Sequence, residues 1–137
     1  MKVLVATDGS EPSIKAVRRA LELAEKEKAE IALISVAYFS KDDFDDMPPR
    51  IQEKLERQAV IALDKAKGLF EERGGKVELI LETGFVPANN IIKRAKEGKF
   101  DLILMGSTGL TGLDRILMGS TAAKVVTNAP CSVSIIR

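Results

Sequence analysis

The chain has 137 residues, of which 45% are hydrophobic and 30% charged, and its 21 basic residues nearly balance its 20 acidic ones. Such a composition is typical of one soluble domain, and it argues against a disordered chain, a transmembrane protein and a protein built mainly to coat nucleic acid or an anionic membrane. Histidine is absent, which excludes Ser-His-Asp catalysis and histidine-ligated metal sites. The single cysteine, Cys131, cannot form an internal disulfide, and the chain does not open with a signal-peptide pattern, so we expect a cytoplasmic protein with one domain over residues 1–137.

Five short apolar runs rich in branched residues are predicted to form β-strands. Each run is nearly continuous in hydrophobicity rather than alternating, as expected when both faces of a sheet are covered. In chain order, the predicted strands are Val3–Ala6, Ile31–Ala37, Val77–Leu81, Leu102–Met105 and Ser132–Ile136.

The segments between these runs carry apolar residues at helical spacing. The first predicted helix opens at Ser10, whose hydroxyl can cap it, with Pro12 in the first turn. Gly74-Gly75 and Gly98 are predicted to end the second and third helices. The four apolar stripes consist of Ile14, Val17, Leu21 and Ala24; Ile51, Leu55, Ala59, Ala62, Ala66 and Leu69; Ala88, Ile91, Ile92 and Ala95; and Ala122, Val125 and Val126.

An acidic stretch, Lys41–Arg50, follows the second predicted strand. We interpret it as a solvated surface connection, and the alternative is a flap over a ligand. Elsewhere, the alternation of strands and helices predicts right-handed βαβ crossovers and a mainly parallel sheet. We therefore expect an α/β fold, a doubly wound five-stranded parallel sheet with helices on both faces.

Two glycine-rich segments lie where such a fold binds ligands, beyond the carboxyl ends of its strands. Gly106–Gly112 follows the fourth predicted strand, and Gly119–Thr121 opens the last helix. Glycines let the backbone approach a ligand, and a helix N-terminus favours a phosphate, so together the two segments suit a di- or triphosphate. The alternative is that they are ordinary loops and helix caps. Neither a Walker loop nor a Gly-x-Gly-x-x-Gly fingerprint is present.

Three further residues near this edge have both a functional and a structural interpretation. Asp8 follows the first predicted strand, where it could bind a ribose hydroxyl, support a phosphate-bound cation, or simply stabilise a turn. Met105 fits the core and stands beside the glycine-rich segment, where it could touch a ligand. Cys131 is interpreted as a small buried apolar residue, because no base is available to activate it.

Four segments of the chain together resemble the universal stress protein family. They are Val3–Ser10, Gly106–Gly109, Gly119–Ala122 and Ala129–Val133. The resemblance covers essentially the whole chain. Its most specific part is the spacing Gly-x2-Gly-x9-Gly-Ser, the pattern of the ATP-binding branch of the family, which is met here by Gly106, Gly109, Gly119 and Ser120.

This resemblance implies a sheet in the order 3-2-1-4-5, of the adenine-nucleotide alpha hydrolase-like type, with ATP bound between the first and fourth strands, accompanied by Mg²⁺ or Mn²⁺. At the adenosine end it implies Ala6, Thr7 and Asp8, together with the backbone of Val36. Gly84 matches a family glycine after the third strand, and Thr108 stands where the family often has histidine or arginine. The residues implied to hold the phosphates are Met105, Gly106, Gly109, Gly119, Ser120 and Thr121.

The last predicted strand, Ser132–Ile136, would be an exposed apolar edge on a monomer, and the resemblance implies a homodimer joined through it. We therefore expect a nucleotide-dependent regulatory or protective stress-response protein, with neither nucleic acid nor membrane as a partner. One alternative is a slow ATP hydrolase or adenylyl-transferring enzyme on the same fold. The other is a dimerisation module that binds no nucleotide.

Overall fold

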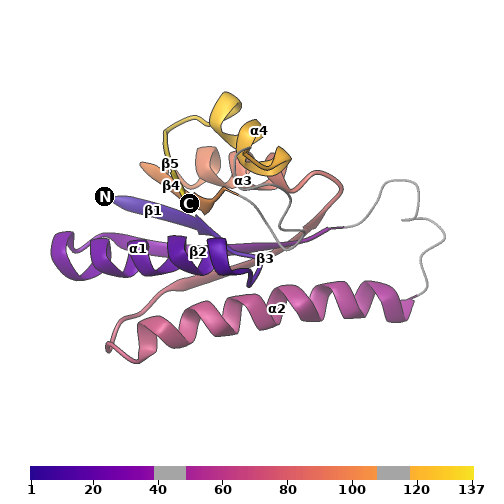
Figure 1. Cartoon of the computed structure of the whole chain (residues 1–137), viewed down its shortest axis with the longest axis horizontal. Helices are drawn as coiled ribbons and strands as arrows, with labels where there is room; N and C mark the ends of the chain where they lie inside the picture. Colours follow the sequence, from indigo (N-terminus) through magenta and orange to yellow (C-terminus); the bar gives the residue numbers. More distant parts are fainter. Residues whose placement is uncertain (39–48, 108–117) are drawn as a thin grey trace.

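Strands and helices alternate along the part of the chain that the computed structural model describes, residues 1–38, 49–107 and 118–137 (Figure 1). Every predicted strand is present, and β3 extends beyond its predicted end at Leu81. The elements are β1 (Lys2–Ala6), α1 (Glu11–Glu27), β2 (Glu30–Tyr38), α2 (Pro49–Glu71), β3 (Glu78–Gly84), α3 (Pro87–Glu97), β4 (Leu102–Gly106), α4 (Ser120–Asn128) and β5 (Ser132–Ile136).

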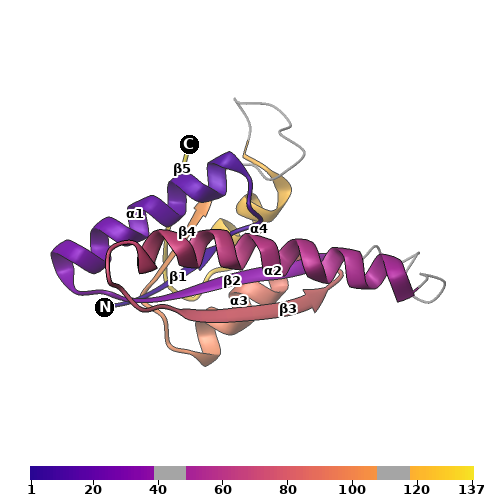
Figure 2. The same ribbon diagram turned by 90° about the horizontal axis from the view of Figure 1, so that it is seen from below.

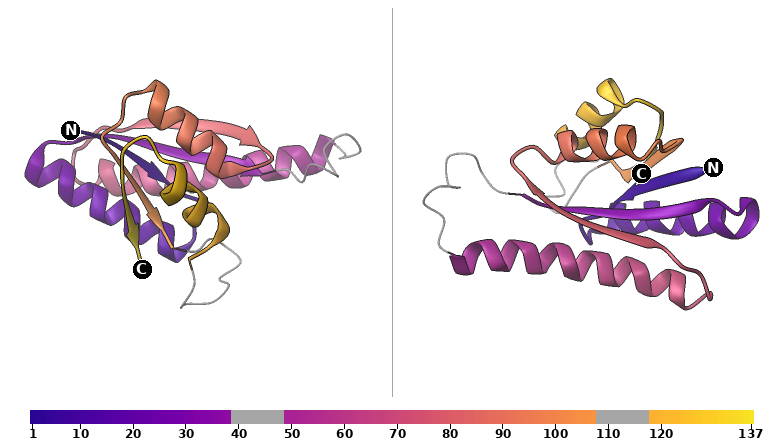
Figure 3. Two further views of the ribbon diagram at one scale, coloured as in Figure 1. Left: turned by 90° about the horizontal axis from the view of Figure 1, so that it is seen from above. Right: turned by 180° about the vertical axis from the view of Figure 1, so that it is seen from behind.

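The five strands form one parallel sheet in the order β3-β2-β1-β4-β5, as predicted. Helices α1 and α2 cover one face of the sheet, and α3 and α4 cover the other (Figures 1 and 3). The order reverses between β1 and β4, because β2 and β3 lie on one side of β1 while β4 and β5 lie on the other. In an open α/β sheet this reversal leaves a crevice at the carboxyl ends of the strands.

Alternate residues of the central strands supply two separate apolar cores. Val3 and Val5 of β1 pack with α1 and α2, whereas Leu4, between them, packs with α3 and α4. All three side chains are fully buried. The continuous hydrophobicity of the strands is therefore explained by a sheet that is covered on both faces.

The first helix begins as the sequence predicts. Ser10 is its N-cap, and the Ser10 side chain accepts a hydrogen bond from the Ser13 N–H, while Pro12 lies in the first turn. At the end of α2, Gly74 has a φ of +72°, and the Gly75 N–H donates to the Phe70 carbonyl at 2.9 Å. Here the glycine supplies the left-handed conformation that turns the chain back toward β3.

The third helix ends at its predicted residue for a different reason. Gly98 has a right-handed conformation, and it is Lys99 that has the positive φ, +54°. A Cβ on Gly98 would collide with the ring of Phe100. Glycine is thus required there because the buried Phe100 ring packs against the backbone.

Two details of α2 and α4 differ from the prediction. Helix α2 starts at Pro49, so positions 49 and 50 are helical rather than part of the acidic connection, whose residues 41–48 lie outside the described ranges. Ile51 and Val126, each part of a predicted apolar stripe, are 40% and 46% exposed. Ile51 lies in the first turn of α2, and Figure 2 shows that this end of the helix extends beyond the end of β3. Among the described residues, no helix is both long and apolar enough to cross a membrane.

Candidate functional site

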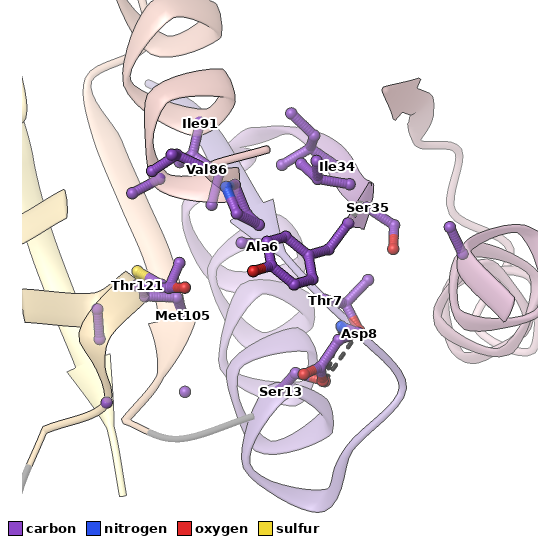
Figure 4. Close-up of a pocket in the computed structure, with 18 of the residues that line it drawn as sticks. Ala6, Thr7, Asp8, Ser13, Ile34, Ser35, Val86, Ile91, Met105 and Thr121 are labelled. Carbon is purple, nitrogen blue, oxygen red and sulfur yellow. Dashed lines mark hydrogen bonds between the residues drawn. The ribbon is translucent and has the colours of Figure 1, made fainter. Parts of the chain in front are cut away.

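A cavity of about 720 Å³ opens at the carboxyl ends of β1, β2 and β4, where the strand order reverses (Figure 4). Its walls come from all four helices and from the connection between β3 and α3. The lining residues are Ala6, Thr7, Asp8, Ser13, Ile34, Ser35, Val36, Ala37, Tyr38, Leu55, Gln58, Ala59, Phe85, Val86, Pro87, Ala88, Ile91, Met105, Gly106, Ser107, Gly119, Ser120, Thr121, Ala122 and Lys124.

The predicted site residues within the described ranges all line this cavity, although they come from four distant parts of the sequence. Ala6 is the last residue of β1, Thr7 and Asp8 follow it, and Val36 lies near the end of β2. The predicted phosphate-holding residues found in its walls are Met105, Gly106, Gly119, Ser120 and Thr121. Gly109 and Thr108 lie outside the described residues. The role of each predicted site residue in ligand binding stays a prediction.

A network of buried hydroxyls fixes the turn that presents Asp8. The Thr7 and Ser13 hydroxyls lie 3.0 Å apart, and Ser13 Oγ donates to the Ser10 carbonyl at 2.9 Å. The Ser10 N–H in turn donates to Asp8 Oδ1 at 2.9 Å. Thr7 and Ser13 are each only 4% exposed, so their polar groups are satisfied inside the protein. Figure 4 shows Thr7, Asp8 and Ser13 side by side at the edge of the cavity.

The polar end of the cavity lies at the start of α4. Gly119 is the N-cap, and as a glycine it has no side chain that could cap the helix. Ser120 and Thr121 occupy the first turn, where N–H groups have no partner within the helix. Two nearby amides are already used: the Gly119 N–H donates to the Ser107 carbonyl at 2.6 Å, and the Ser107 N–H donates to the Ile136 carbonyl at 3.1 Å. In this structure the Gly119 amide is therefore paired with the Ser107 carbonyl, which directly follows β4.

Lys124 brings a positive charge to the same end and is not among the residues predicted from the sequence. It is exposed and lines the cavity one helical turn after Ser120. The sequence signal that could have identified Lys124 is its spacing from Ser120, because residues four apart share a face of a helix. Asp8 is the one carboxylate among the described lining residues, and no cluster of three potential metal-ligating His, Cys, Asp or Glu side chains occurs in the described part of the chain.

Gly106 and Gly84 have packing roles that the sequence does not reveal. A Cβ on Gly106 would lie 2.7 Å from the backbone carbon of Pro12, so β4 ends directly against the first turn of α1. Gly84 does not line the cavity, and a Cβ there would collide with the Asn90 side chain. Gly84 thus leaves room for the Asn90 side chain of α3.

Cys131 is partly buried beside β5. Burial raises the pKa of its thiol, and the negative charge of Asp101 raises that pKa further. A raised pKa reduces the thiolate fraction at neutral pH, which agrees with a structural rather than a nucleophilic role.

We expect Cys131 to react with a thiol reagent at neutral pH several-fold more slowly in the folded protein than in the protein unfolded by denaturant. Asp101→Asn should speed the folded-state reaction modestly, because it removes the smaller of the two causes. Absorbance of the released chromophore measures both rates. Equal rates in the folded and unfolded protein would contradict the assignment.

Comparison with known proteins gives one consistent result. The model of the universal stress protein family matches residues 1–137. A universal stress protein from Methanocaldococcus jannaschii is 40% identical, over 99% of this chain and 81% of its own. The structure of universal stress protein UspA from Lactobacillus plantarum has a TM-score of 0.82 and 27% identity, covering 100% of this chain and 97% of that chain.

A further solved structure is that of a universal stress protein in complex with cAMP. It has a TM-score of 0.75 and 27% identity, and the match covers 100% of this chain and 97% of that one. The family model and the sequence relative agree on the family, and the solved structures share the fold. This chain belongs to the universal stress protein family.

Proposed function

We propose that this protein binds an adenine nucleotide, with ATP as the ligand, and acts as a nucleotide-dependent regulatory or protective protein in a stress response. The observation that carries the proposal is the cavity at the strand reversal, which has an apolar end and a polar end. A nucleotide has the same division, with a flat base at one end and charged phosphates at the other. The cAMP complex of a related protein supports this choice of ligand class.

The walls suggest how the nucleotide would lie. Ile34, Val36 and Ile91 form an apolar surface that suits the base. Asp8, which lines the cavity and accepts a hydrogen bond from Ser10 within its turn, would accept hydrogen bonds from ribose hydroxyls. The phosphates would extend toward the first turn of α4 and Lys124, because a helix N-terminus and a cation both attract negative charge.

A divalent cation fits this arrangement only as a partner of the phosphates. Mg²⁺ prefers one or two carboxylates together with phosphate oxygens and water, and Asp8 could supply one carboxylate. When bound, such an ion would neutralise phosphate charge. The described lining residues offer no second carboxylate that could serve as a base for an attacking water, so we propose binding with at most slow hydrolysis.

We further propose a cytoplasmic homodimer joined through β5. This strand lies at the edge of the sheet, and its apolar residues Val133, Ile135 and Ile136 are only partly buried. An uncovered edge of this kind pairs readily with a second copy. Sedimentation of the purified protein tests the proposal, and a concentration-independent monomer would refute it.

Isothermal titration with ATP, ADP and AMP tests the nucleotide proposal directly. Mass spectrometry of small molecules released from freshly purified protein adds an independent test, because a tightly held nucleotide would co-purify. If all three nucleotides fail to bind and none co-purifies, the chain has kept the fold without the ligand, and the dimerisation module becomes the better description.

Asp8→Asn is expected to weaken ATP binding about fivefold, because an amide is a poorer acceptor than a carboxylate for a ribose hydroxyl. The asparagine keeps an oxygen that can accept the Ser10 N–H, so the turn should survive. Titration with ATP and with its 2′,3′-dideoxy analogue measures the effect. The substitution should change the affinity for the analogue much less, and an equal loss for both ligands would show that Asp8 does not meet the ribose.

A further inference from the structure

Tyr38 ends β2 at the mouth of the cavity and is unusually exposed for an aromatic side chain. Ile34 and Val36 pack on the α3 side of the sheet, and Tyr38 continues this alternation two residues later. It lines the cavity, yet 53% of it is exposed. Aromatic side chains normally contribute most of their surface to packing. Here the structure leaves a flat apolar surface open beside an apolar wall.

A second aromatic residue lies next to it. In the sheet register Tyr38 pairs with Gly84, and Phe85 follows immediately at the start of the connection to α3. Phe85 also lines the cavity and is 41% exposed.

Side-chain hydrogen bonds hold the end of β3, which directly precedes Phe85. Asn90 Nδ2 donates to Glu82 Oε1 at 2.9 Å and to the Thr83 carbonyl at 3.2 Å. Arg94 Nε donates to Glu82 Oε2 at 2.8 Å. The missing side chain at Gly84 gives Asn90 the space for these bonds. Phe85 therefore follows a strand end that is tied to α3.

We propose that Tyr38 and Phe85 form an aromatic rim that stacks on the purine base of the bound nucleotide and makes the base, in addition to the phosphates, a determinant of specificity. This inference rests on the proposed function and deepens it. Aromatic rings stack on the flat faces of bases, and the contact grows with the size of the base. The rim thus favours purine nucleotides over pyrimidine nucleotides and over ribose phosphates that carry no base.

The composition of the chain provides a direct test. Tyr38 is the only tyrosine and tryptophan is absent, so the intrinsic ultraviolet fluorescence of the protein reports mainly on the rim. AMP is the suitable probe, because with a single phosphate its affinity depends strongly on the base. We expect AMP to quench the tyrosine emission, after correction for absorption by the nucleotide, and ribose 5-phosphate to leave it nearly unchanged.

Substitutions of Tyr38 test whether its aromatic ring contributes to nucleotide binding. Tyr38→Ala is expected to weaken AMP binding about tenfold by isothermal titration, whereas Tyr38→Phe keeps the ring and should retain most of the affinity. The affinity for ribose 5-phosphate should be the same in all three proteins. Leu81→Ala is the matched control, since Leu81 is 45% exposed on β3 and does not line the cavity. Thermal unfolding of each variant verifies that the fold is intact.

The possible failures are distinguishable. If the unaltered protein binds AMP but Tyr38→Ala binds it equally well and AMP causes no quenching, the rim proposal is overturned and the proposed function stands. A tenfold loss for CMP as well as AMP would overturn the preference for purines. If the unaltered protein binds none of AMP, ADP and ATP, the proposed function itself fails.

Discussion

Replacing Gly106 with alanine is expected to lower the free energy of unfolding by about 3 kcal/mol. The new Cβ would lie 2.7 Å from the Pro12 backbone carbon and 2.8 Å from the Pro12 carbonyl oxygen. These atoms belong to the first turn of α1 and cannot rotate away as the end of a side chain could. The protein must therefore shift β4 relative to α1, in a region where both are well packed. Urea unfolding followed by circular dichroism measures the loss.

Gly68→Ala is a control that should change the free energy of unfolding in the opposite direction. Gly68 lies within α2, and a Cβ there would meet nothing within 4 Å. Alanine is preferred over glycine in a helix interior by up to about 1 kcal/mol, so this variant should be slightly more stable than the unaltered protein. Equal unfolding midpoints for Gly106→Ala and the unaltered protein would mean that β4 does not end so close to Pro12.

Lys124→Glu is expected to weaken ATP binding about 30-fold, or by about 2 kcal/mol, at low ionic strength. Two unit charges about 4 Å apart interact by about 1 kcal/mol in water, and reversing one of them changes attraction into repulsion for more than one phosphate. Screening by salt reduces the total. Titration at two salt concentrations should show the effect shrinking as salt rises.

Ligand charge and the position of the lysine supply the controls. AMP carries fewer charges, so Lys124→Glu should weaken its binding less than that of ATP. Lys15→Glu changes an exposed lysine of α1 that does not line the cavity, and it should leave the ATP affinity nearly unaltered. If the two charge reversals weaken ATP binding equally, the phosphates do not extend toward α4.

Local sequence patterns predict the elements of this fold well, and the sheet order follows from the family resemblance. The branched apolar runs and the helical stripes are strong signals because nearly every one faces a covered surface. Helix α2 shows where this reasoning stops. Ile51 fits the apolar stripe, yet it is exposed because the helix extends beyond the end of β3. Periodicity shows which side of a helix is apolar but does not reveal how far the covering sheet reaches.

The cavity walls were predictable where they carry glycines or end a strand, and were missed where tertiary packing creates them. Asp8 follows a strand, so its place at the crevice can be inferred. Tyr38 and Lys124 carry no motif, and only the assembled sheet brings them to the same cavity. Gly106 fits the family spacing, whereas its contact with Pro12 depends on the packing of α1 against β4.

The pairing of β1 with β4 is short: three residue pairs join these strands, compared with seven between β2 and β3. The cavity lies over this junction, with Asp8 on one side and the first turn of α4 on the other. A molecule held by both sides would act as a clamp between the two halves of the sheet. Its binding free energy would then support the strand pair with the fewest paired residues in the sheet, so occupancy would raise the stability of the folded domain.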